Sequence, residues 1–180
     1  QIVLRERVFQ HLQLYPSRRS RSYPNSPMGA VALIRQALTD ADWYRQARQA
    51  VQADPALPMP EWNVALQELQ PVIQGQQTIV VDGSNELYAL RADRLAREFS
   101  LQLIIRGSGR EYRRLEAIHA AKRAMIVPVN FPEAPEVATR ADAADATLQE
   151  LMHWRLAPDN PARLEEARVD MALTADGLSK

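Results

Sequence analysis

The sequence contains no cysteine, and this absence excludes disulfide bonds, a thiolate nucleophile and a cysteine-ligated zinc site. Histidine is also scarce, with only three in 180 residues. His11, His119 and His153 lie too far apart to form a His-x-His or His-Glu-x-x-His motif. We therefore expect His119 and His153 to be exposed or partly packed helical side chains rather than metal ligands.

The chain has no excess of charge of either sign, because 22 Lys and Arg balance 22 Asp and Glu. A neutral chain lacks the electrostatic footprint of a general nucleic-acid or membrane-surface protein. It also lacks the run of about 20 apolar residues that a membrane-spanning helix needs. We expect neither nucleic acid nor membrane among its partners, and the composition leaves the compartment open.

The sequence divides into three segments that suit one domain or a fragment of one. Residues 1–27 form an N-terminal segment with a basic loop, residues 28–75 a helical segment, and residues 76–180 a series of repeated βα units. The arginines of the basic loop are expected to face solvent. Because the chain starts with Gln1 rather than Met, we expect it to belong to a longer polypeptide.

The helical segment carries clear start and stop signals. Ser26 is a good N-cap and Pro27 suits the first helical position, so a helix is predicted from here to about Ala53. A second helix is predicted over residues 61–74, with Pro71 ending or kinking it.

Strand-like and helix-like stretches then alternate. Strands are expected near residues 78–81, 101–105, 125–129 and 169–174, and Asn160 is expected to cap a helix between the last two. This alternation predicts an α/β fold with parallel strands. Two architectures fit: the later half of a (βα)8 TIM-type barrel, or a small open doubly wound sheet. Both place ligands at the carboxyl ends of the strands.

Polar side chains cluster at these predicted strand ends. A carboxylate-only magnesium site at Asp82 and Asp176 would need the two strand ends to be neighbours. We take four of the polar residues as candidate ligand-binding residues: Asp82, Arg106, Ser108 and Asn130.

The loop from Arg106 to Arg110 follows a strand and precedes a helix. Ser108 lacks the Gly-x-Ser-x-Gly spacing of a nucleophile elbow, and no histidine lies at a strand end to act as its base. The small residues and two arginines suit an anion at a helix N-terminus. An ordinary tight turn uses the same residue types, so both interpretations stay open.

The sequence resembles the amidohydrolase superfamily, specifically its imidazolonepropionase-like branch of metal-dependent hydrolases. The resemblance covers about Ser22 to Gly177 and is clearest over residues 22–36, 89–99 and 172–178. It implies a (βα)8 barrel of which this chain is the later part. It also implies hydrolysis of non-peptide C–N bonds by metal-activated water, with zinc as the family's metal.

By this resemblance, Asp176 stands where the family has an aspartate that binds metal and handles a proton, so it is the candidate catalytic residue. Asp82 and Arg106 stand where the family has metal-binding histidines. Arginine has no lone pair to offer a cation, so the resemblance implies a degenerate site and no metal in this chain. The alternative is a non-catalytic structural or anion-binding and substrate-binding module. A small-molecule substrate is the expected ligand.

Arg106 should pair with Asp82 or Asp176, because an inward charge is costly to leave unpaired.

Half a barrel has two open strand edges and an uncovered face. The chain should therefore form a homodimer through this surface, or cover it with residues 1–15.

Overall fold

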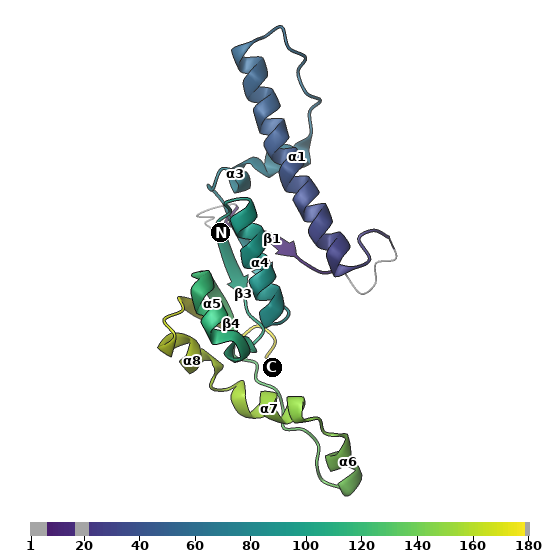
Figure 1. The fold of residues 1–180 in the computed structure, drawn as a ribbon, viewed down its shortest axis with the longest axis vertical. Helices are drawn as coiled ribbons and strands as arrows, with labels where there is room; N and C mark the ends of the chain where they lie inside the picture. Colours follow the sequence, from purple (N-terminus) through teal and green to yellow (C-terminus); the bar gives the residue numbers. More distant parts are fainter. Residues whose placement is uncertain (1–6, 17–21, 179–180) are drawn as a thin grey trace, which may run out of the picture. The chain divides into compact units, whose positions relative to one another are not determined.

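The computed structural model of this chain describes residues 7–16 and 22–178. It shows an α/β protein in which helices and strands alternate along the chain (Figure 1). The strands form one five-stranded sheet in the order β1-β2-β3-β4-β5. The strands are β1 (Phe9–Gln13), β2 (Thr78–Asp82), β3 (Leu103–Arg106), β4 (Ala124–Pro128) and β5 (Met171–Thr174). Three arginines of the predicted basic loop, Arg18, Arg19 and Arg21, lie outside the described residues.

The strands pair in parallel, as predicted. β3 pairs with β4 and β4 with β5, and the first of these pairs places Arg106 beside Ile126. β2 runs in the same direction as β3, because Ile79 N donates to Gln102 O at 2.9 Å and Gly83 N donates to Arg106 O at 2.8 Å.

The strand order decides between the two predicted architectures. Spatial order follows chain order throughout, so the sheet has no point at which the order reverses. A doubly wound sheet requires such a reversal, whereas a (βα)8 barrel does not. The doubly wound alternative is therefore wrong, and the fold is that of part of a TIM-type barrel.

Strand β1 was not predicted. Its sequence, FQHLQ, lacks the strict alternation of apolar and polar residues that is typical of a half-buried strand. In the structure its side chains alternate only between exposed and half-buried. β1 lies beside β2 at one edge of the sheet. The described part of residues 1–15 therefore extends the sheet and does not act as a cover over its open face.

Helix α1 (Pro27–Ala53) begins as predicted, and Ser26 Oγ accepts a hydrogen bond from Gly29 N at 3.1 Å. The predicted helix over residues 61–74 is instead two short helices, α2 (Val64–Glu68) and α3 (Gln70–Ile73). They separate at Leu69 because Pro71 has no N–H with which to continue the helical ladder.

The remaining helices connect the strands of the βα series. They are α4 (Glu86–Glu98), the 3-10 helix η1 (Glu111–Arg114), α5 (Leu115–Ala121), α6 (Arg140–Asp145), α7 (Leu148–Leu156) and α8 (Asn160–Glu166). Helices α6 and α7 are separate because Thr139 and Thr147 each start a new helix with its own capping box. No helix in the described ranges is long and apolar enough to span a membrane.

The described chain forms two compact units. Among the described residues, the first unit contains 7–16 and 22–80 together with Arg94–Leu103. The second unit contains Val81–Asp93 together with residues 104–178. The first unit buries Leu38, Tyr44 and Val72, and its helix α1 forms an ion pair through Arg35 with Glu98 at 2.8 Å.

In the second unit, one face of the sheet is covered and the other is more open. Ile105 and Met125 are buried on the covered face, where α8 packs against η1 and α5. Arg106 and Ile126 lie side by side in the register and therefore share the opposite face, where both are only half-buried. A barrel segment has this asymmetry, because its inner face is enclosed by the other strands.

Candidate functional site

Three polar side chains from the carboxyl ends of strands meet in the second unit. The Arg106 guanidinium donates from Nη1 to Asp82 Oδ1 at 3.2 Å and from Nη2 to Asp176 Oδ2. Asp82 is the last residue of β2, Arg106 is the last residue of β3, and Asp176 follows β5. We call these three residues the strand-end cluster. The predicted pairing of Arg106 is confirmed, and it involves both carboxylates.

The cluster is a direct consequence of parallel strands. Asp82 and Arg106 end neighbouring strands, while Asp176 belongs to a strand beyond β4. Arg106 reaches it because the arginine side chain is long and extends across the end of the intervening strand. The Asp82 side chain is 23% exposed, that of Arg106 41% and that of Asp176 60%. Solvent and solutes therefore have access to all three.

Asn130, another candidate, packs against the turn that carries Asp176. Gly177 has a φ of +89°, and a Cβ at this position would lie 2.5 Å from Asn130 Nδ2. Only glycine suits both the left-handed backbone and this close approach. The structure therefore places Asn130 beside the cluster, in contact with the turn rather than with the ion pairs.

Ser108 does not join the cluster. Its backbone N–H and its hydroxyl donate to Glu111 Oε1 at 2.6 and 3.2 Å. The N–H of Gly107 donates to Ile126 O at 2.8 Å. Because an internal carboxylate takes the donors of Ser108, the turn interpretation of this loop fits the geometry better than an anion site.

Glu111 is the main polar residue that the sequence did not reveal. It is fully buried, and its Oε2 accepts a hydrogen bond from Asn160 Nδ2 at 2.8 Å. Asn160 Oδ1 in turn accepts from Tyr112 N at 2.8 Å. The prediction that Asn160 caps its helix is wrong: the N-cap is Asp159, and the Asn160 side chain turns into the core to bind η1.

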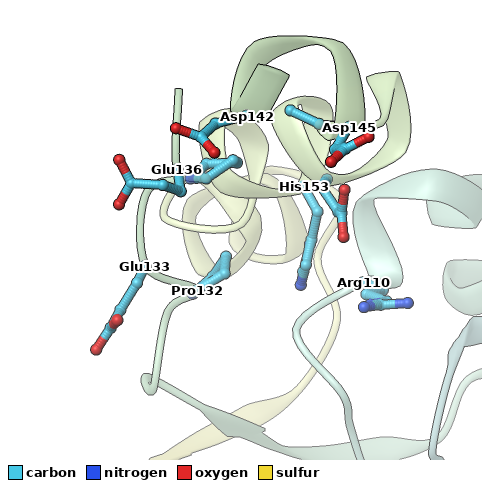
Figure 2. Close-up of a pocket in the computed structure, with 10 residues that line it drawn as sticks. Arg110, Pro132, Glu133, Glu136, Asp142, Asp145 and His153 are labelled. Atoms are coloured by element: carbon cyan, nitrogen blue, oxygen red, sulfur yellow. The ribbon is translucent and has the colours of Figure 1, made fainter. Parts of the chain in front are cut away.

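A cavity of about 470 Å³ lies beside α6 and α7. His153 lines it, and His153 Nδ1 lies 3.2 Å from Tyr112 Oη. Burial lowers the pKa of His153, and the nearby charges of Arg110 and Arg113 lower that pKa further. Figure 2 shows Glu133 and Glu136 pointing away from His153, while Asp145 lies on the same side of the cavity as His153.

The strand-end cluster does not fit a metal ion. Its two carboxylates share a guanidinium, which is permanently charged and cannot ligate a cation. Among residues 7–16 and 22–178, no group of three His, Cys, Asp or Glu side chains is placed to hold a metal. Zinc-activated water therefore has no protein ligand set in the described part of the chain.

No protein-family model matches the chain. No curated protein matches it. Among solved structures, the chain is similar to the crystal structure of an amidohydrolase from Thermotoga maritima MSB8, with a TM-score of 0.68 and 18% sequence identity. The match covers 94% of this chain and 42% of that chain, so the present chain spans less than half of the protein it resembles. At this identity the likeness establishes the fold.

Proposed function

We propose that this chain is the later part of an amidohydrolase-like barrel, and that its strand-end cluster binds a small polar substrate. The observation that carries the proposal is the meeting of Asp82, Arg106 and Asp176 at the end of the sheet where barrels of this kind bind ligands. The fold likeness to an amidohydrolase supports the class of substrate, a compound with a non-peptide C–N bond.

The chemistry of the cluster suits an amide. A guanidinium donates hydrogen bonds to a carbonyl oxygen, and a carboxylate accepts one from an amide N–H. A cyclic amide presents both groups side by side, which matches the neighbouring Arg106 and Asp176. In this proposal Asp176 is the group that accepts the hydrogen bond of the substrate N–H.

Hydrolysis requires more than this cluster. The described residues supply no set of ligands for a metal ion that would activate water. We propose that the chain by itself binds and orients the substrate without turning it over.

Isothermal titration calorimetry with the cyclic amides hydantoin and 2-pyrrolidone tests the proposal, with product release followed in parallel. We expect saturable binding that falls at least tenfold in Asp176→Asn, and no hydrolysis. Asp145→Asn is the matched control, because Asp145 lies on α6 outside the cluster. Absence of binding, or equal binding by Asp176→Asn, would contradict the proposal.

One observation favours a purely structural module as the second candidate. The charge of Arg106 is already matched by two carboxylates, as in a structural ion-pair network. In that case neither amide binds, while Asp82→Asn and Asp176→Asn still lower the midpoint of thermal unfolding.

A further inference from the structure

One guanidinium links two acidic side chains that the sheet does not bring together. Asp82 ends β2 and Asp176 follows β5, and β3 and β4 lie between those strands. Arg106 contacts both carboxylates through different terminal nitrogens. Without this positive charge, two carboxylates would face the same small volume and repel each other.

We infer that Arg106 is a built-in cation: its guanidinium takes the place of a metal ion in holding Asp82 and Asp176 together, and it excludes divalent cations from the strand ends. Two physical properties support this inference. The guanidinium stays protonated at every physiological pH, so it neither leaves nor exchanges. It also repels any other cation that approaches the carboxylates within a few ångströms.

Removal of the guanidinium leaves two acceptor-only carboxylates with no counter-charge. Arg106→His replaces the long side chain by a shorter imidazole, and a zinc ion between this ring and the two carboxylates would have the mixed nitrogen and oxygen ligand set that zinc accepts. The wild-type chain should therefore exclude zinc, and a single substitution should admit it.

The experiment uses zinc chloride alone, with calorimetry and elemental analysis after dialysis on the full 180-residue chain. We expect well under one zinc per chain in the wild type and in Arg106→Lys, and about one in Arg106→His. The double variant Arg106→His, Asp176→Asn should lose most of this zinc, with an affinity at least tenfold lower.

Arg35→His is the matched control. Arg35 also forms an ion pair, but with a single carboxylate, that of Glu98. An imidazole at this position meets one carboxylate instead of two, so we expect no stoichiometric zinc. If Arg35→His binds zinc as well as Arg106→His does, the particular arrangement at the strand ends is not responsible and the inference is wrong.

Folding is followed by circular dichroism in the same samples. If Arg106→His is unfolded without metal, the inference requires zinc to restore its fold, and a variant that stays unfolded with zinc overturns it. One equivalent of zinc in the wild type, or a folded Arg106→His that binds none, overturns it too. These outcomes do not depend on amide binding, so this inference and the proposed function fail separately.

Discussion

Asn160 Nδ2 donates a hydrogen bond to Glu111 Oε2 at 2.8 Å, and both side chains are fully buried. The bond connects η1 to α8 and holds the carboxylate that receives the N–H of Ser108. It therefore supports the loop that begins at Arg106, although neither residue touches the strand-end cluster.

Asn160→Ala should destabilise the fold because it leaves a buried carboxylate oxygen without its donor. Loss of the partner of a buried polar group costs roughly 1–3 kcal/mol. Urea unfolding followed by circular dichroism measures the change. Asn25→Ala, at an exposed asparagine, should change stability by less than about 0.5 kcal/mol. Equal stabilities for the two variants would show that the buried bond contributes nothing.

Gly177→Ala should disturb the turn that carries Asp176. The new Cβ would meet Asn130 Nδ2 at 2.5 Å and would add strain at a φ of +89°. Gly109 is the matched control, because it has a φ of +78° but nothing within 4 Å of its Cβ position. Both substitutions carry a left-handed penalty of about 1–2 kcal/mol, and only Gly177→Ala adds a collision.

The second step of this test uses Asn130→Ala. Removal of the Asn130 side chain relieves the collision, so it should partly rescue Gly177→Ala and should not rescue Gly109→Ala. Thermal unfolding of the three single variants and the two double variants gives the coupling. Equal effects of Asn130→Ala in both backgrounds would contradict the contact.

The strand-end cluster was predictable from sequence because it depends on two local features. β-branched runs such as Thr78–Asp82 mark strands, and parallel strands bring their carboxyl ends to one edge of the sheet. The start of α1 was equally accessible, because Ser26 and Pro27 are adjacent in the sequence.

The features that were not predicted depend on distant contacts. Asn160 looks like a helix cap in sequence, and only the packing of α8 against η1 shows that it binds Glu111. Strand β1 pairs with a strand more than 60 residues later, and its side chains are only half-buried at best. Local periodicity carries no information about either relationship.

Self-association should occur through the open strand edge at β5. Leu173 lies on this strand and is 58% exposed. Unpaired edges with exposed apolar side chains pair readily with other strands, and a lysine on such an edge blocks that pairing. We expect the wild type to form a dimer in analytical ultracentrifugation and Leu173→Lys to shift it to monomer.

Leu148→Lys is the control for this prediction. Leu148 is even more exposed, at 73%, but it lies on α7 rather than on a strand edge. We expect Leu148→Lys to leave the dimer intact. A wild-type monomer, or the same loss of dimer in both variants, would show that β5 is not the interface.

His153 should make stability fall as the solution becomes acidic. Burial is the main cause of its lowered pKa, and the charges of Arg110 and Arg113 add to the effect. The unfolded chain then binds a proton near the ordinary histidine value of about 6.5, before the folded chain does. The contribution of His153 is therefore fully present above this pH and is lost as the pH falls toward the folded-state pKa.

A titration of the His153 ring by NMR checks both the direction and the cause of the shift. Arg110→Gln should move the pKa upward because it removes a repelling charge, and stability should then decline less below pH 6.5. Arg140→Gln, an exposed arginine on α6 that is not among the causes of the shift, should leave the pKa in place. A wild-type pKa at or above the ordinary value would contradict the prediction, because a partly buried ring beside two arginines cannot gain a proton as easily as one in water.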